Sequence, residues 1–240
     1  MINNKLHCYS LKMQHRMRPD IADLVVGSIY DELLNHDSVK RYPDVKGITK
    51  NVYFITHTEK ESAESDSCSK SNAHEAKFIA GLCRYLVLQD YKPEQITVLT
   101  MYTGQMFLLK REILNTKTCQ GVRITCVDNF QGEENDIILL SLVRSNTDGK
   151  IGFLSIDNRI CVSLSRAKHG LYVVGNMSAM TNKSKTWRTI MDKLEAHDEY
   201  GEALELECQI HGTRTKVQTG QDFIKVPEGG CDQLCDTILP

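Results

Sequence analysis

Two arginines, Arg16 and Arg166, are the residues of this sequence best suited to chemistry on a phosphoryl group. Transfer of that group spreads negative charge over its oxygens, which clustered guanidinium groups stabilise. Arg16 lies just before a helix pattern that opens at Pro19. Arg166 follows Arg159 by seven residues, so two turns of a helix could direct both side chains the same way. Taken singly, each is better explained as a solvated or salt-bridged surface arginine.

A second polar cluster leads directly into a long apolar run. Residues 127–136 read VDNFQGEEND and precede the apolar run Ile137–Val143. Gly132 allows a tight backbone turn, and the Glu134 carboxylate could accept hydrogen bonds from ribose hydroxyls. A Gly-Glu-Glu turn also occurs in many ordinary surface loops, so this short stretch is a weak signal by itself.

The sequence contains no phosphate-binding loop of its own. Gly149-Lys150 comes nearest, but Arg144 stands where the loop needs its first glycine, and Ile151 replaces the hydroxyl residue that would hold Mg²⁺. Asp31-Glu32 lies inside a helix pattern, so it is not a metal-holding strand end. The chain therefore has groups that could complete a nucleotide site, but none that would hold the nucleotide's phosphates alone.

Short apolar runs alternate with amphipathic stretches along the chain. Helical spacing predicts helices over residues 75–88, 107–114 and 184–197, and Asn72 with Glu75 three residues on predicts a cap for the first. Residues 57–71 are polar and indicate a surface loop. The runs expected to form strands are Val52–Ile55, Ile96–Thr100, Val122–Val127, Ile137–Val143 and Leu171–Gly175. This alternation implies an α/β fold, with a parallel sheet and helices on both faces.

Composition limits the class of protein. The chain has 240 residues, 41% hydrophobic and 25% charged, enough for one large domain with or without an appendage. A formal net charge of −2 gives no bulk attraction for nucleic acid, so any such surface must be a local arrangement of charge. No apolar run approaches the roughly 18 residues that span a bilayer, and the first residues lack a signal core. Nine cysteines without a secretory signal favour reduced thiols, so we expect a cytoplasmic protein, with a nuclear location also open.

Three motifs together resemble the second RecA-like domain of superfamily 1 helicases, in the group that includes the nonsense-mediated-decay helicase and senataxin. Residues 14–19, QHRMRP, resemble that group's Q-Y-R-M-x-P, and residues 127–136 resemble its V-D-x-F-Q-G-x-E-x-D. Residues 158–168, NRICVSLSRAK, resemble N-R-x-N-V-A-L-[ST]-R-A-[RK]. Order and spacing agree, over most of residues 10–177. The resemblance implies a RecA-like sheet and the motor half of an ATP-dependent RNA helicase.

The resemblance also implies roles for individual residues. Arg16 and Arg166 match the family's arginines that reach the γ-phosphate of ATP across a cleft. The residues matched to the ribose-side motif are Gln131, Gly132 and Glu134. ATP and Mg²⁺ would be held mainly by the first RecA-like domain of the same protein. The chain alone is therefore expected to be inactive as an ATPase.

The chain departs from the family's pattern at three motif positions. His15 stands where the family usually has a tyrosine near the adenine, and an imidazole stacks more weakly. Cys161 and Ser163 replace an asparagine and an alanine. These departures leave a second function open, in which a motor-like fold holds RNA while its ATP role has lapsed.

Residues at strand ends are expected to hold single-stranded RNA. Residues 100–105, TMYTGQ, are similar to the family's T-P-Y-x-G-Q, with Met101 replacing proline. Hydroxyl and amide contacts to the phosphate backbone do not read bases, so RNA is implied by the resemblance alone and DNA is not excluded. Thr100 could also be an ordinary strand-end threonine. The residues expected at this surface are Thr100, Tyr102, Gln105, Thr125 and Asp128.

The sequence changes character after about residue 200. We expect the motor domain over residues 1–200 and a small cysteine-rich appendage over 201–240, with few apolar residues beyond Cys208. Residues 227–235, PEGGCDQLC, resemble the entry to NFX-type zinc-finger arrays. The alternatives are structural zinc, thiols without metal, ligands that await further fingers, and an interaction platform centred on this tail. The four candidate zinc ligands are Cys208, His211, Cys231 and Cys235.

Overall fold

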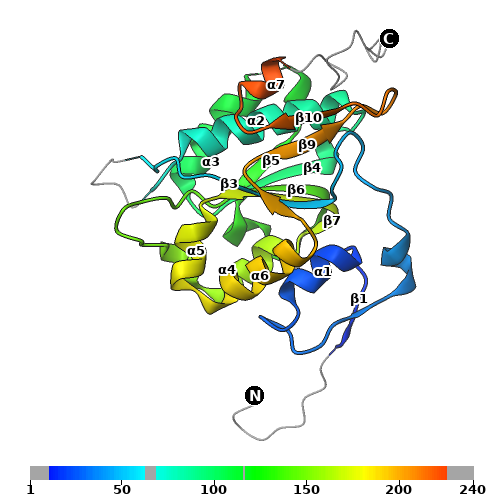
Figure 1. Cartoon of the computed structure of the whole chain (residues 1–240), viewed down its shortest axis with the longest axis vertical. Coiled ribbons are helices and arrows are strands. Elements are labelled where there is room, and N and C mark those ends of the chain that lie inside the picture. Colours follow the sequence, from blue (N-terminus) through cyan, green and yellow to red (C-terminus); the bar gives the residue numbers. More distant parts are fainter. Residues whose placement is uncertain (1–10, 63–68, 116, 226–240) are drawn as a thin grey trace, which may run out of the picture.

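A six-stranded parallel sheet forms the centre of the protein (Figure 1). The computed structural model describes residues 11–62, 69–115 and 117–225. The strand order is β5-β4-β6-β7-β3-β8, and every neighbouring pair is parallel. The α/β architecture predicted from the sequence is confirmed. The strands are β3 (Val52–Thr56), β4 (Ile96–Thr100), β5 (Arg123–Cys126), β6 (Asn135–Ser141), β7 (Ala167–Gly175) and β8 (Tyr200–Gly201).

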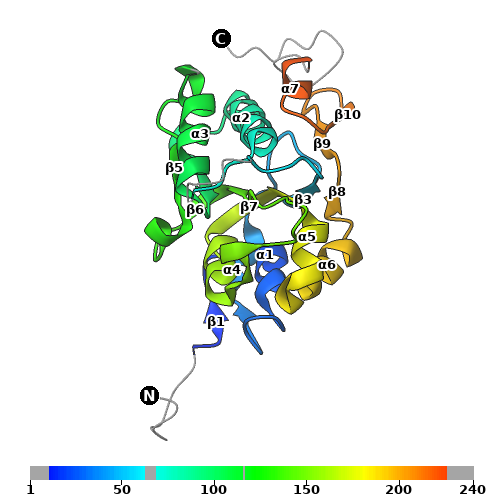
Figure 2. The same ribbon diagram turned by 90° about the vertical axis from the view of Figure 1, so that its left-hand side faces the viewer.

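Helices cover both faces of this sheet, as Figure 2 shows. One face carries α2 (Ala73–Leu88), α3 (Thr103–Leu114) and the short α7 (Asp222–Lys225). The other carries α1 (Pro19–Val25), α4 (Asp157–Leu164), α5 (Met177–Lys183) and α6 (Lys185–Ala196). Each layer has its own apolar core, with Phe78 and Leu82 on the first side and Trp187 and Ile190 on the second. Strands β4 and β6 are buried on both faces, which explains their nearly continuous apolar sequences.

The amino end of α2 is capped as predicted, but Glu75 has a different role. The Asn72 side chain accepts hydrogen bonds from the backbone N–H groups of His74 and Glu75. The Glu75 carboxylate does not return to the Asn72 amide, which donates to Gln105 Oε1 at 2.7 Å. Glu75 is instead fully buried and accepts from the Ser141 hydroxyl at 2.6 Å. The cap therefore links α2 to α3 and β6.

The described part of the tail packs against α2. Strands β9 (Leu204–Glu207) and β10 (Arg214–Val217) form an antiparallel hairpin, followed by α7. Leu206, Val217 and Phe223 are buried in the core that includes α2. These buried side chains hold the hairpin against α2. The sequence pattern had suggested instead a segment with few core residues, which would need a metal or another cross-link to fold. The boundary at residue 200 stays a prediction.

Candidate functional site

Arg16 and Arg166 lie side by side at the amino ends of β6 and β7. Arg16 Nη1 donates to the carbonyl oxygen of Ser165 at 3.3 Å, and Arg166 is the next residue, immediately before β7. Burial lowers the pKa of Arg166, and the positive charge of Arg16 lowers it further. The structure thus brings two like charges, distant in sequence, to one edge of the sheet.

Backbone carbonyls and a hydroxyl hold the Arg166 guanidinium in place. Its Nε donates to the Val162 carbonyl at 3.0 Å, and Nη1 donates to the Glu133 carbonyl at 3.2 Å. Its Nη2 donates to the Ser165 hydroxyl at 2.8 Å. None of these three acceptors is a carboxylate. Arg166 can therefore attract an anion without first breaking a hydrogen bond to a carboxylate.

Arg159 does not share a helix with Arg166, so the expectation that two helical turns align them is wrong. Helix α4 ends at Leu164, and Arg166 follows the cap residue Ser165. Arg159, near the start of α4, donates to the Asp128 carboxylate at 2.8 Å. Its guanidinium carbon lies 4.2 Å from the centre of the exposed Phe153 ring. Arg159 therefore belongs to a separate cluster.

Glu134 links two cations at the same edge. Its carboxylate accepts from Arg16 Nε at 2.6 Å, and Lys168 Nζ lies 2.9 Å from its other oxygen. The hydrogen bonds from Arg16 and Lys168 lower the pKa of Glu134, so the carboxylate is ionised near neutrality. Because Glu134 neutralises part of the charge on Arg16, an incoming phosphate would compete with it for that guanidinium.

Gln14 fixes the backbone that carries Arg16, a role that the motif alone did not reveal. Its Oε1 accepts from the backbone amides of Arg16 and Met17 at 2.9 and 2.8 Å. Its Nε2 donates to the Met17 carbonyl and to Asn35 Oδ1, each at 2.6 Å. Gln14 itself belongs to β1 (Met13–Gln14), which pairs with β2 (Leu34–Asn35). The available signal was a glutamine, able both to donate and to accept, two residues before the candidate arginine Arg16.

The turn before β6 borders a surface pocket. Gly132 has φ of 86°, and a Cβ there would meet nothing within 4 Å. Glycine is therefore favoured by the left-handed backbone and not by close packing. Gln131 lines a pocket of about 310 Å³. The other lining residues are Val127, Asp128, Asn158, Arg159, Cys161 and Val162.

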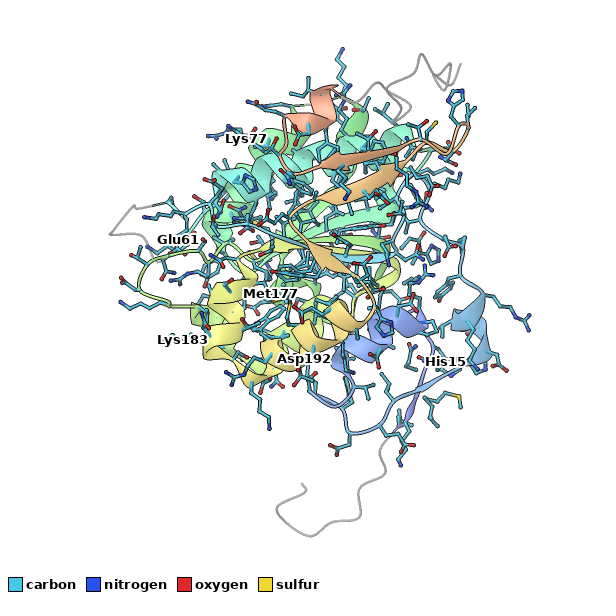
Figure 3. The ribbon with its side chains drawn as sticks, viewed as in Figure 1. His15, Glu61, Lys77, Met177, Lys183 and Asp192 are labelled. Atoms are coloured by element: carbon cyan, nitrogen blue, oxygen red, sulfur yellow. The ribbon has the colours of Figure 1, made fainter. Side chains whose placement is uncertain are left out.

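Two aromatic residues near the cluster differ in how far the sequence could reveal them. His15 is exposed, and its ring lies 4.1 Å from that of His36, centroid to centroid. Figure 3 places His15 at the margin of the molecule on the α1 side. The Tyr30 hydroxyl and the Cys161 thiol lie 3.6 Å apart. Their interaction, and then burial, raise the pKa of Tyr30, while the charges of Arg166 and Arg16 oppose the shift. No motif points to Tyr30, and only the fold brings it here.

The residues predicted to bind RNA lie near the carboxyl ends of β4 and β5. Thr100 and Gln105 are fully buried, and Tyr102 is nearly so. The Gln105 amide is engaged by Asn72 and Ser141 and faces no solvent. Thr125 is half-buried and Asp128 is exposed. The RNA contacts of these five residues stay predictions, and the burial of Gln105 indicates a structural role as well.

The candidate zinc ligands are only partly within the described residues. Cys208 Sγ and His211 Nδ1 lie 3.7 Å apart at the tip of the β9–β10 hairpin. Cys231 and Cys235 lie outside the described residues. Over residues 11–62, 69–115 and 117–225, no group of three or more metal-binding side chains converges. The four-ligand zinc site stays a prediction.

Comparison with known proteins decides the family. A family model described as an AAA domain matches residues 1–178. The chain belongs to this family, as the C-terminal RecA-like domain of superfamily 1 helicases related to regulator of nonsense transcripts 1. The predicted family is confirmed.

Individual relatives agree with this assignment. This helicase domain is 51% identical over 230 residues to NFX1-type zinc finger-containing protein 1 of Mus musculus, covering 95% of the chain and 12% of that relative. It is 37% identical over 191 residues to a helicase required for RNAi-mediated heterochromatin assembly of Schizosaccharomyces pombe, covering 78% of the chain and 19% of that relative. A putative regulator of nonsense transcripts 1 of Takifugu rubripes is 33% identical over 194 residues, covering 76% of the chain and 18% of that relative. The chain thus spans less than a fifth of each of these relatives.

Membership of this family implies ATP and Mg²⁺, and the residues of this helicase domain fit the phosphate groups. Arg16 and Arg166 offer guanidinium donors at one edge of the sheet. The nearby carboxylates are less suited to Mg²⁺, because Glu134 already accepts from Arg16 and Lys168.

Within the described ranges, no helix has the length and apolar character needed to cross a bilayer.

Proposed function

We propose that this chain is the C-terminal motor half of an ATP-dependent RNA helicase. In this proposal Arg16 and Arg166 bind the γ-phosphate of an ATP molecule that the first RecA-like domain holds across a shared cleft. The observation that supports it best is the pairing of two guanidinium groups at one sheet edge, where burial and then the positive charge of Arg16 lower the pKa of Arg166. An anion between the two guanidinium groups would relieve their repulsion. The same two charges would stabilise the negative charge on the oxygens of the phosphoryl group during its transfer.

Glu134 would then act on Arg16 in two ways. While the cleft is open, its carboxylate keeps the Arg16 side chain at the sheet edge through the 2.6 Å hydrogen bond. When the cleft closes, Arg16 turns part of its hydrogen bonding toward phosphate, and Lys168 continues to neutralise Glu134. His15, Gln131 and Gly132 would border the adenosine part of the nucleotide. Mg²⁺ would be held mainly by the first domain.

The RNA-binding part of the proposal uses the carboxyl ends of β4 and β5. The segment 127–134 runs from the carboxyl end of β5 to the amino end of β6 and includes both Asp128 and Glu134. Phe130 anchors the segment in the core beneath α4. A shift of this segment on cleft closure would move both ends together, so the grip on single-stranded RNA would change with the nucleotide state.

The test joins this chain to the first RecA-like domain of the same protein and measures RNA-stimulated ATP hydrolysis. We expect Arg166→Ala and Arg16→Ala each to lower the rate by roughly 10³–10⁵, the range for arginine fingers. Arg188→Ala is the matched control, because Arg188 is exposed on α6 and its side chain donates to the Thr181 carbonyl, far from the arginine cluster in sequence. The chain alone should hydrolyse ATP at a rate near background.

Two outcomes would contradict the proposal. Robust ATP turnover by the isolated chain would show that the arginines do not act across a cleft. An unchanged rate in the joined Arg166→Ala protein would favour the alternative in which the ATP role has lapsed and the fold only holds RNA.

A further inference from the structure

Two histidines face each other at the carboxyl end of β3, far from the arginine cluster. His57 follows β3 directly, and His74 lies in the first turn of α2. Their ring centroids are 4.8 Å apart, and the ring planes make an angle of 45°. The His57 side chain is only 5% exposed. The ends of β3 and α2 therefore hold two imidazoles within reach of one small ligand.

The hydrogen bonds of His57 define which ring nitrogen is available. Its Nε2 lies 3.1 Å from Glu75 Oε1. The Glu75 carboxylate is fully buried and also accepts from the Ser141 hydroxyl and the Val143 amide. Because both Glu75 oxygens already accept from these groups, we assign Nε2 of His57 as a donor to Glu75. In the neutral ring, Nδ1 then carries the lone pair.

Both imidazoles have a buried nitrogen without a partner. His57 Nδ1 and His74 Nε2 are buried, and neither has a hydrogen-bond partner within the described part of the chain. Buried polar atoms in proteins are rarely left in this state, and an ion or a water usually accounts for one. Two such atoms on adjacent rings leave a place for a water or an ion, and the lone pair assigned to His57 Nδ1 suits a cation.

The space beside the rings is open to solvent and acidic. A pocket of about 300 Å³ is lined by His57 and His74 together with Glu59, Ser178, Tyr200 and Glu202. Neither Glu59 nor Glu202 forms an ion pair within the described residues. The segment bearing His57 is fixed, because the carbonyl of Glu59 accepts from the Asn72 side chain at 3.1 Å. A cation in this pocket would meet two imidazole rings and the carboxylates of Glu59 and Glu202.

We propose that His57 Nδ1 and His74 Nε2 together bind a divalent transition-metal ion such as Zn²⁺. Imidazole nitrogen is a preferred ligand of such ions, and a carboxylate that accepts from the other ring nitrogen is the usual support. Glu75 provides that support to His57. No third metal-binding side chain converges with the pair in the described residues. Water completes the coordination, with the Glu59 and Glu202 carboxylates at the pocket wall.

This site is separate from the tail ligands and from the arginine cluster. It is connected by direct hydrogen bonds to the predicted RNA-binding edge, because Ser141 donates to Glu75 and accepts from Gln105. A metal at His57 would therefore lie close to the residues that hold the carboxyl ends of β4 and β6, whether or not the proposed helicase function is correct.

The test titrates the full chain with Zn²⁺ and follows the ring nitrogens of each histidine by NMR, which separates this site from zinc bound to thiols. We expect the His57 and His74 signals to shift together. In His74→Gln, the His57 signal should require at least about 10-fold more Zn²⁺, since one of the two ligands is gone. His197→Gln is the control, because His197 is exposed at the end of α6.

Two results would overturn the inference. If the His57 and His74 signals do not respond while other residues bind Zn²⁺, the pocket holds only water. If His57 responds at the same Zn²⁺ concentration in His74→Gln and in the unmodified chain, the two imidazoles do not act as a pair. A circular dichroism spectrum of His74→Gln unchanged from that of the unmodified chain shows that the variant is folded.

Discussion

Replacing Gln105 with leucine tests whether this residue supports the fold or only a ligand. Gln105 is fully buried on α3. It accepts from the Asn72 amide at 2.7 Å and donates to the Ser141 hydroxyl at 2.9 Å. Leucine has a similar volume, so Gln105→Leu removes these hydrogen bonds without leaving a large cavity.

The expected loss of stability can be worked from these contacts. The Asn72 amide would be left buried without a partner, which costs about 1–3 kcal/mol. The Ser141 hydroxyl keeps Glu75 as its acceptor and loses one hydrogen bond, worth about 0.5–1.5 kcal/mol. We therefore expect Gln105→Leu to lower the free energy of unfolding by about 1.5–4.5 kcal/mol.

Urea unfolding of the two proteins, with the slope of the transition compared, measures this difference. Gln131→Leu is the matched control, because Gln131 is exposed, and we expect its effect to lie within about 0.5 kcal/mol. A change below about 0.5 kcal/mol in Gln105→Leu, accompanied by weaker RNA binding, would refute the structural reasoning and favour a direct RNA contact.

Three further perturbations have defined outcomes. Burial raises the pKa of Glu199 from 4.5 to about 7 in the folded protein. Between these two pH values the Glu199 carboxyl loses its proton more readily in the unfolded chain, so the free energy of unfolding falls as pH rises from 4.5 to about 7. Glu199→Gln should remove this dependence on pH. Its free energy of unfolding should exceed that of the unmodified chain by on the order of 1–3 kcal/mol at pH 8 and should equal it at pH 4, as measured by urea unfolding at each pH. Gln14→Leu releases the backbone of Arg16 and should lower RNA-stimulated ATP hydrolysis of the joined protein at least about 10-fold; an unchanged rate would show that Gln14 is dispensable. Phe223→Ala should cost about 2–4 kcal/mol and expose the β9–β10 hairpin to proteolysis, whereas Ile224→Ala, at a side chain that is 74% exposed, should change neither.

The strands of the central sheet could be predicted because their sequences are dominated by burial. β4 and β6 lie between two helix layers, so apolar side chains are required on both faces. The first helix of the α2–α3 layer was predicted for a similarly local reason, since the Asn72 cap acts on amides two and three residues away. The strand β8 has only two residues, and pairing with β3 alone defines it, so no local pattern could reveal it.

The end of α4 illustrates where pattern reading failed. The spacing of Arg159 and Arg166 suits two helical turns, but the helix ends at Leu164 without a glycine or proline to signal it. The chain must enter β7 at Ala167, because Asn135 and Ala167 pair at the start of β6 and β7. The requirements of the sheet thus outweigh the helical preference of residues 165 and 166.

The sequence by itself determined the family, the parallel α/β sheet and the choice of Arg16 and Arg166 as candidate site residues. Each of these depends on residue types within short segments. The tertiary structure decided what those residues contact. Arg16 meets Glu134 across 118 positions of the chain, and Lys168 meets the same carboxylate from β7. The His57–His74 pair, likewise, exists only because the carboxyl end of β3 and the amino end of α2 lie side by side. Hydrogen bonds and charge interactions act over a few ångströms, so which groups share them depends on strand order and not on distance along the sequence.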